Sequence, residues 1–229
     1  MPSKTIIVTG ASGNLGKAVV KKFIDNEYNV IGTVHKKENN ISGENNLQEA
    51  ELDLLNEENS EKFVSGVVEK YGAIDVAVLT AGGFAPGNID KTKTSDITQQ
   101  YQLNFETAYN IARPVFLQMM KQNMGRIFLI GSRQGLNILK GKGALAYGFS
   151  KSLLFRLAEL LNAEAKGKNV VVSVIVPSVI DTPSNRESMP DENFNDWVAP
   201  SAIANVIYFY SSDEGNTIRE PVIKMYGKS

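Results

Sequence analysis

The chain has 229 residues, enough to bury one sizeable core, and 42% of them are hydrophobic and 21% charged, as is typical of a globular protein. A formal net charge of -1, without a long run of either sign, argues against nucleic acid or an anionic membrane as the main partner. With no cysteine and a single histidine, His35, the chain has no disulfide, no thiolate zinc site and no cysteine nucleophile, and we expect no metal site. The N-terminus lacks the pattern of a signal peptide and residues 170–176, the longest apolar stretch, are too short to span a bilayer, so we expect a cytoplasmic protein.

Short apolar segments alternate with longer amphipathic stretches along the whole chain. The segments with strand character are 5–8, 30–34, one ending at Asp53, 74–79, 127–130, 170–176 and the weaker 222–225. The stretches with a helical period are 13–26, 56–71, 95–122, 143–166 and 201–211, and Pro114 should kink the third of them or mark a helix start. This alternation predicts an α/β protein with one domain over residues 1–229: a Rossmann-type, doubly wound parallel sheet of about seven strands with helices on both faces.

Residues 178–200 form the longest segment without periodicity, and it follows a predicted strand. Ligands of a doubly wound sheet bind beyond the carboxyl ends of the strands, and loops of this length are usually functional. We therefore expect residues 178–200 to be a substrate lid, with Phe194 and Trp197 able to cover a ligand. The alternative is a packed surface loop in which Trp197 is simply buried.

The first predicted strand runs directly into a turn that carries three glycines within residues 9–16 and precedes a helix. A tight turn needs positive φ, a pyrophosphate needs close approach of the backbone, and a helix N-terminus offers free N–H groups and the positive end of a dipole. An ordinary glycine turn is the alternative. At this place in a doubly wound sheet, however, the pattern predicts that a dinucleotide is bound by Gly10, Ser12, Gly13, Asn14, Leu15 and Gly16.

Tyr147 and Lys151 are four residues apart on a predicted helix, so their side chains share a face. An ammonium group beside a phenol favours the phenolate, which should lower the Tyr147 pKa towards the pH at which the protein works. By itself, the pair is also typical of ordinary packing next to a solvated charge.

Beside the glycine turn, this pair resembles the catalytic motif of the short-chain dehydrogenase/reductase family, and the resemblance covers nearly the whole chain. The family's serine after the fifth strand matches Ser132, and its asparagine in the long fourth helix matches Asn104. The resemblance implies that reduced nicotinamide delivers hydride to a carbonyl carbon while Tyr147 gives a proton to the oxygen. It further implies that Ser132 hydrogen-bonds that oxygen, that Lys151 holds the nicotinamide ribose, and that Asn104 shapes the helix near Lys151.

The same resemblance implies cofactor contacts at the ends of several strands, in addition to those of Tyr147 and Lys151. These contacts fall on Asp53, Leu54, Ala81, Gly82, Gly83, Pro177, Val179 and Thr182. Taken one at a time, Asp53 and Thr182 could cap the helices that follow them, Ser132 could cap a turn, and Asn104 could be an ordinary surface amide.

Three positions depart from the family pattern. Asn14 stands where compact members usually carry a glycine, but asparagine tolerates positive φ. Ser178 replaces the glycine that usually follows Pro177, and the separation of Ser132 and Tyr147 is slightly long, with residues 140–143 as the segment that would loop out.

Within the family, the chain is most similar to the dihydropteridine reductase branch, on residues 81–83, 147–148, 181–186, 188–190 and Trp197. Two features disagree with that branch. It lacks the catalytic serine, yet Ser132 is present, and it carries an acid after the second strand, where this chain has His35. Quinonoid dihydropteridine reduction therefore stays an alternative activity, and a dinucleotide-sensing protein without chemistry is a second alternative.

The residues after the second predicted strand bear on the choice of cofactor. An acid there would bind the ribose 2′-hydroxyl and repel a 2′-phosphate, but this chain has His35, Lys36 and Lys37, with no acid before Glu38. We expect His35 and Lys36 to contact the cofactor and NADP(H) to be preferred over NAD(H), although Lys36 and Lys37 could be solvated loop charges and the pterin branch favours NADH. The expected partners are a small carbonyl or alcohol substrate and, by family resemblance, further copies of the chain in a homodimer or homotetramer, but no nucleic acid and no membrane.

Overall fold

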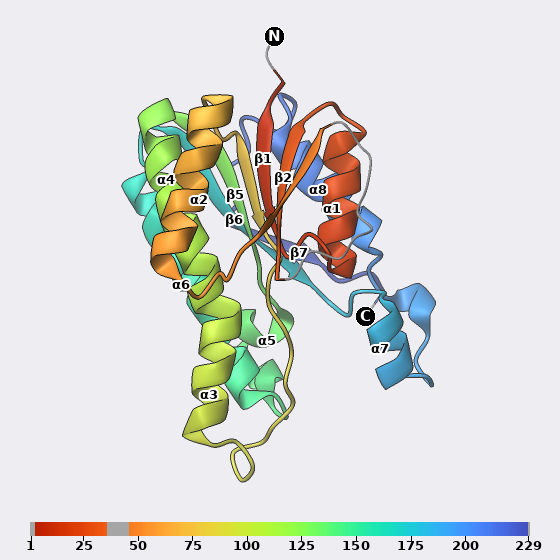
Figure 1. The fold of residues 1–229 in the computed structure, drawn as a ribbon. Coiled ribbons are helices and arrows are strands. Elements are labelled where there is room, and N and C mark those ends of the chain that lie inside the picture. The colour runs from red at the N-terminus through yellow and green to blue at the C-terminus, as the bar shows by residue number, and fades with distance from the viewer. Residues whose placement is uncertain (1–2, 36–45, 229) are drawn as a thin grey trace.

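A computed structural model describes residues 3–35 and 46–228. Its strands form one parallel sheet of seven, in the order β3-β2-β1-β4-β5-β6-β7 (Figure 1). They are β1 Thr5–Thr9, β2 Asn29–Val34, β3 Leu47–Glu51, β4 Val76–Leu79, β5 Met124–Ile130, β6 Asn169–Pro177 and β7 Val222–Met225. The helices are α1 Asn14–Ile24, α2 Glu57–Tyr71, α3 Thr94–Tyr101, α4 Thr107–Gln122, α5 Arg133–Leu136, α6 Leu145–Glu164, α7 Pro183–Ser188 and α8 Pro200–Ser211. The predicted doubly wound parallel sheet is confirmed.

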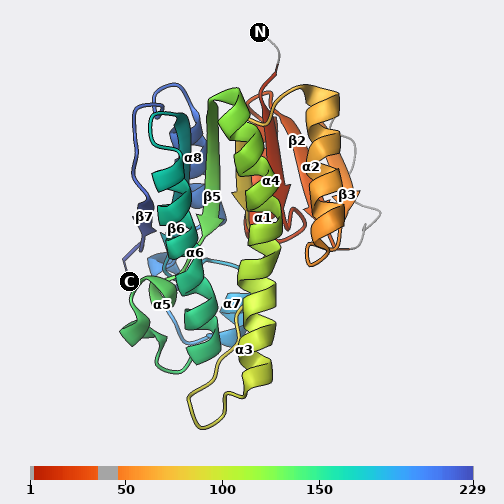
Figure 2. The same ribbon diagram turned by 90° about the vertical axis from the view of Figure 1, so that its left-hand side faces the viewer.

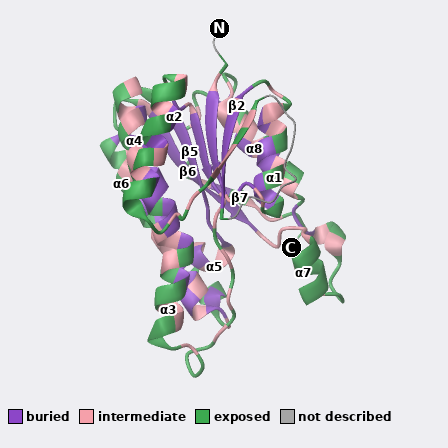
Figure 3. Ribbon diagram, viewed as in Figure 1, coloured by how far each residue is buried: buried purple, intermediate pink, exposed green. Residues whose placement is uncertain are grey.

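Helices cover both faces of the sheet. Helices α2, α4 and α6 lie on one face, and α1 and α8 lie on the other (Figures 1 and 2). Successive side chains of a strand point to opposite faces, so Ile7 of β1 packs beneath α4 while Ile6 and Val8 pack beneath α1 and α8. Strands β1, β2, β4, β5 and β6 are accordingly buried almost throughout, whereas the edge strands β3 and β7 are largely intermediate or exposed (Figure 3).

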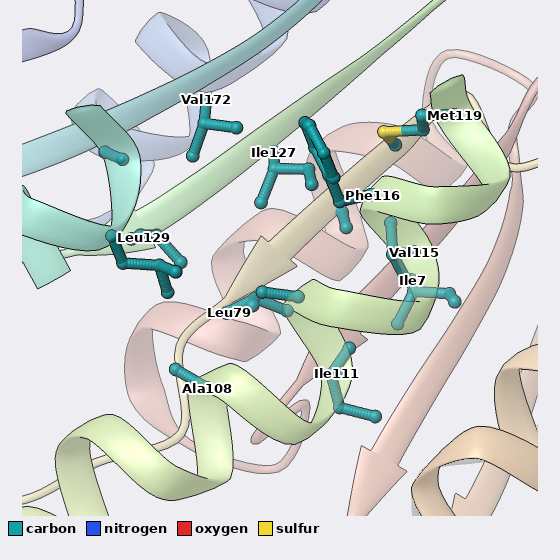
Figure 4. Close-up of a cluster of buried hydrophobic side chains, with 14 of the residues drawn as sticks. Ile7, Leu79, Ala108, Ile111, Val115, Phe116, Met119, Ile127, Leu129 and Val172 are labelled. Atoms are coloured by element: carbon teal, nitrogen blue, oxygen red, sulfur yellow. The ribbon is translucent and has the colours of Figure 1, made fainter. Parts of the chain in front are cut away.

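The core beneath α4 illustrates why these sequences form these elements. Ile111, Val115 and Met119 recur at helical spacing along α4 and meet Ile127 and Leu129 of β5 (Figure 4). All five side chains are fully buried. This packing fixes the position of β5 and β6 relative to the helices, and therefore the position of the residues that follow each strand.

The parts of the chain that lie beyond the carboxyl edge of the sheet are α3, α5 and α7 (Figures 1 and 2). Here the structure differs from the prediction of one helix over 95–122. Helix α4 continues through Pro114, so the predicted start there is wrong, and the irregularity is instead a π-helical turn, Gln102–Glu106, between α3 and α4. Such turns are frequent at functional sites, and this one contains Asn104.

Two further segments differ from the sequence prediction. Residues 178–200 were predicted to lack regular structure, but they contain α7 and a 3₁₀ turn, Phe194–Asp196. Between Ser132 and Tyr147 the extra length does not loop out freely, because it forms α5 and a second 3₁₀ turn, Ile138–Gly141. Short helices of this kind bury too few side chains to leave a periodic pattern in the sequence.

Candidate functional site

Ser132, Tyr147 and Lys151 meet at the carboxyl edge of the sheet. Ser132 follows β5 directly and is the N-cap of α5, where its Oγ accepts a hydrogen bond from the Gly135 amide over 3.0 Å. Tyr147 and Lys151 lie in the first turns of α6, on one face of that helix. Ser132 therefore caps a helix, which is one of the two roles that the sequence analysis allowed. The capping bond also fixes the Ser132 hydroxyl beside Tyr147.

Burial and Ser132 have opposite effects on the pKa of the Tyr147 phenol. Burial raises its pKa above the ordinary 10.0, and a side-chain hydrogen bond with Ser132 lowers it in part. The sequence-based expectation that Lys151 lowers this pKa is wrong for the structure. The Lys151 Nζ lies 5.9 Å from the Tyr147 ring centre and donates instead to the Ile130 carbonyl oxygen over 2.8 Å.

Lys151 itself is a buried amine, with 6% of its surface exposed. Burial lowers its pKa from the ordinary 10.5 to about 8, because the charged form loses its hydration. Its cation is therefore present at neutral pH and is lost at mildly alkaline pH.

This titration predicts a pH profile. If reduction requires the Lys151 cation, activity is full below the folded-state pKa and declines as the pH rises through about 8. We expect kcat/KM for carbonyl reduction to fall about tenfold per pH unit on the alkaline side. In Lys151→Arg, whose guanidinium stays protonated, this decline should vanish whatever the absolute rate. An alkaline limb at the same pH in both proteins would contradict the assignment.

Asn104 connects three parts of the site. Its Oδ1 accepts from the Gly83 amide over 3.0 Å, and its Nδ2 donates to the Gly83 carbonyl oxygen over 3.0 Å and to Ser150 Oγ over 3.2 Å. Nδ2 also donates to Gln100 Oε1 over 3.1 Å, and Ser150 in turn donates to the Tyr147 carbonyl oxygen over 2.9 Å. Asn104 is thus not a surface amide: it is buried and ties the turn after β4 to the helix that carries Tyr147.

The glycine turn between β1 and α1 has the geometry that a bound pyrophosphate requires. Gly10 has φ +63°, and a Cβ on Gly16 would lie 2.1 Å from the Gly10 carbonyl oxygen. No side chain caps the start of α1, so its first amides are free of side-chain partners. Leu15 is buried under the turn, Ser12 is half-buried, and Gly13 and Asn14 are exposed where a phosphate would approach. These residues fit a dinucleotide.

The remaining predicted cofactor positions follow strands at the carboxyl edge of the sheet. The Ala81 amide donates to Thr9 Oγ1 over 3.2 Å, which joins the turns after β4 and β1, and an added Cβ at Gly82 would meet Asn104 Oδ1 at 2.6 Å. Thr182 caps α7 by accepting from the Asn185 amide, one of the roles left open by the sequence.

On the side where the adenine is predicted to bind, Asp53 is exposed and lies two residues beyond the end of β3. It accepts a hydrogen bond from the Leu55 amide over 3.0 Å. Asp53 does not cap α2, because the N-cap of that helix is Asn56. The Leu54 carbonyl oxygen accepts from Asn110 Nδ2 over 2.9 Å. His35 is exposed directly after β2. Lys36, Lys37 and Glu38, on which the expected cofactor preference depends, lie outside the described residues.

A cavity of about 490 Å³ adjoins Ser132, Tyr147 and Lys151. Pro177 and Val179 line it, as do Asn185 and Met189 of the predicted lid and Lys140 of the segment 140–143. Phe84, Arg133 and Gln134 also line it, and the sequence analysis did not single them out. The Phe84 ring meets the Tyr147 ring edge to face at 5.0 Å while its own side chain is 61% exposed. The signal available for Phe84 was its position directly after Gly82 and Gly83.

Trp197 is buried against Phe194, with ring centres 4.8 Å apart, and neither residue lines the cavity. Within residues 3–35 and 46–228, no cluster of three or more His, Asp or Glu side chains could hold a metal ion. No helix in this described part of the chain is both long and apolar enough to cross a bilayer.

Comparison with known proteins adds to this geometry. The family model described as short chain dehydrogenase matches residues 4–193. A 3-oxoacyl-[acyl-carrier-protein] reductase FabG of Thermotoga maritima is 28% identical over an alignment of 246 residues, gaps included, that covers 99% of this chain and 98% of the relative. A dihydropteridine reductase of Dictyostelium discoideum is 28% identical over 218 residues, with 92% and 89% covered. A solved structure of ElxO with NADP bound has the same fold, with a TM-score of 0.90, 24% identity and 98% of each chain covered.

Proposed function

The chain belongs to the short chain dehydrogenase family, and on this premise we propose that its cavity reduces a small carbonyl compound, or oxidises the corresponding alcohol, with Tyr147 as the proton donor or acceptor. The chain is an NAD(P)-dependent oxidoreductase at the level of its family. The observation that carries the proposal is the pairing of Tyr147 with Ser132 on the wall of a cavity that Lys151 also lines.

In the proposed reduction, the bound nicotinamide cofactor supplies the hydride that reaches the carbonyl carbon. Tyr147 donates its phenolic proton to the carbonyl oxygen, so the C=O bond becomes a C–O–H group and the two-electron reduction balances. Ser132 donates a hydrogen bond to the same oxygen as negative charge develops there. Lys151 places a buried cation 5.9 Å from the centre of the Tyr147 ring, and Asn104 holds Gly83 next to Phe84, which lines the cavity.

Turnover across a panel tests this proposal. The panel contains aldehydes, ketones and quinonoid dihydropterin, each with NADPH and with NADH, and we expect oxidation of reduced cofactor with at least one aldehyde or ketone. Turnover of quinonoid dihydropterin alone would favour the activity that the Dictyostelium relative is named for. Tight cofactor binding without turnover of any compound would favour the dinucleotide-sensing alternative and overturn the proposal.

We also propose a preference for NADPH over NADH, because the residue directly after β2 is His35 rather than an acid and two lysines follow it in the sequence. The double variant Lys36→Ala/Lys37→Ala should narrow the ratio of the two kcat/KM values by about tenfold or more, since each charge-assisted bond to the 2′-phosphate is worth roughly 1.5–3 kcal/mol. Lys166→Ala/Lys168→Ala is the matched control, because these two exposed lysines lie between the end of α6 and the start of β6, remote from the carboxyl edge of the sheet. A clear NADH advantage in the unaltered protein would refute the preference.

For residues 178–200 we propose a substrate lid whose moving part is α7. Asn185 and Met189 line the cavity, yet α7 buries none of its residues, which indicates low local stability. Arg186 is the only trypsin site in this segment. We expect cleavage after Arg186 to slow when cofactor and substrate are both bound, as measured by mass spectrometry of timed digests. Equal cleavage in the free and bound states would count against the lid.

A further inference from the structure

The charged groups of the cavity have one sign. Arg133 and Lys140 line it in addition to Lys151, and no Asp or Glu is among the described residues that do so. The whole chain has a formal net charge of -1, so this local excess of positive charge does not follow from the composition. The rest of the wall is neutral, with apolar Phe84 and Met189 and the amides of Gln134 and Asn185.

Arg133 has no anionic partner in the described part of the chain. It follows Ser132 directly, it is half-buried, and its guanidinium lies 5.1 Å from the centre of the Tyr226 ring. No described residue accepts a hydrogen bond from its guanidinium, whereas every other arginine of the chain donates to a carboxylate, an amide or a carbonyl oxygen. Asp181 directly follows Ile180, which lines the cavity, but its Oδ1 already accepts a hydrogen bond from Arg186 Nε over 2.6 Å.

A half-buried guanidinium without a counter-charge has lost hydration and gained no bond in exchange. Its planar set of donors matches the two oxygens of a carboxylate or a phosphate. Stacking on Tyr226 holds the group in place without using those donors. The stacked guanidinium is thus arranged to receive an anion that the protein itself does not supply.

We propose that the substrate is a carbonyl compound with an anionic group, a carboxylate or a phosphate, and that Arg133 binds this anion with Lys140 assisting at the exposed rim. The proposal rests on the proposed function, since it concerns the substrate of that same cavity. It makes Arg133 a specificity-determining residue and leaves the proton transfer to Tyr147.

Matched compounds that differ only in charge test the proposal. We would compare 2-oxohexanoate and 5-oxohexanoate with their uncharged amides, so that the ketone stays the same and its distance from the anion varies. A third compound of each series carries a phosphonate in place of the carboxylate and distinguishes the two kinds of anion. Binding to the protein loaded with oxidised cofactor is measured by calorimetry, and turnover is measured separately with the reduced cofactor.

For the unaltered protein we expect at least one acid or phosphonate to bind about 10–100-fold more tightly than its amide, the range of a charge-assisted bond. Arg133→Gln should remove most of this difference and leave the amides unaffected, and Arg133→Lys should keep part of it. Lys142→Gln, an exposed lysine outside the cavity wall, is the control and should change neither. Thermal unfolding and cofactor titration show that each variant is folded.

Equal binding of every acid, phosphonate and amide, or an unchanged difference in Arg133→Gln, would overturn the inference. Because binding is measured without turnover, a protein that binds the anions through Arg133 but turns over neither them nor any compound of the aldehyde and ketone panel would refute the proposed function while supporting this site. A protein that reduces the amides as well as the acids would support the proposed function and refute the anion site at Arg133.

Discussion

Replacement of Tyr147 by phenylalanine is expected to lower kcat for carbonyl reduction by roughly 10²–10⁴-fold, the contribution of a positioned proton donor. The buried phenol, with a pKa raised above its ordinary value, holds its proton at neutral pH and can give it to the carbonyl oxygen. Phenylalanine keeps the ring that packs against Phe84 and removes only the hydroxyl. Cofactor binding, measured by fluorescence titration, should therefore stay nearly unchanged.

Two further variants make this result specific. Tyr101→Phe removes the same hydroxyl from a tyrosine on α3 that is 39% exposed and does not line the cavity, and it should leave kcat unaltered. Lys151→Ala should lower both turnover and cofactor affinity, which would distinguish the role proposed for Lys151, holding the cofactor, from the role proposed for Tyr147, moving the proton. Near-normal kcat in Tyr147→Phe would remove Tyr147 from the proposed step.

The elements that sequence predicted well are those whose signal is local. The apolar run 170–176 became β6, Asn169–Pro177, because a strand covered on both faces is apolar almost throughout. The one polar side chain of the run, Ser173, is small and is buried with its hydroxyl bonded to the Glu220 carbonyl oxygen. The glycine turn was equally readable, since its conformation depends on residues close together in the chain. Around the site, the same holds for Tyr147 and Lys151, whose spacing alone places them on one helix face.

The features that sequence did not give depend on contacts between distant segments. The π-helical turn at Asn104 is held by bonds to Gly83 and Ser150, far away in the chain, and leaves no local pattern. The pKa of Tyr147 is raised because burial outweighs the effect of its neighbours, and the extent of burial is a property of the folded cavity. That Arg133 has no anionic partner is likewise not visible in the sequence, because the 25 Asp and Glu residues outnumber the 24 Lys and Arg residues and any of them could have paired with it.

The substitution Gly16→Ala, which adds one methyl group, is the most severe test of the proposed cofactor site at the glycine turn. A Cβ there would lie 2.1 Å from the Gly10 carbonyl oxygen and 2.9 Å from the Ala11 Cα, so the backbone of the turn must move. In Gly16→Ala we expect dinucleotide affinity to fall about 100-fold or more, because displacing the turn removes at least two bonds to phosphate of roughly 1.5–3 kcal/mol each. The free energy of unfolding should fall by about 1–3 kcal/mol, the usual cost of overpacking.

Gly66→Ala separates this steric effect from helix propensity. Gly66 lies inside α2, as Gly16 lies inside α1, but an added Cβ at Gly66 has nothing within 4 Å. Alanine is the better helix former by roughly 0.5–1 kcal/mol, so Gly66→Ala should raise the free energy of unfolding and leave dinucleotide binding unaltered. Denaturant unfolding and NADPH titration of both variants give the comparison. If Gly16→Ala were stabilised like Gly66→Ala and bound NADPH as tightly as the unaltered protein, the close approach of α1 to the Gly10 turn would not be a requirement of the dinucleotide site.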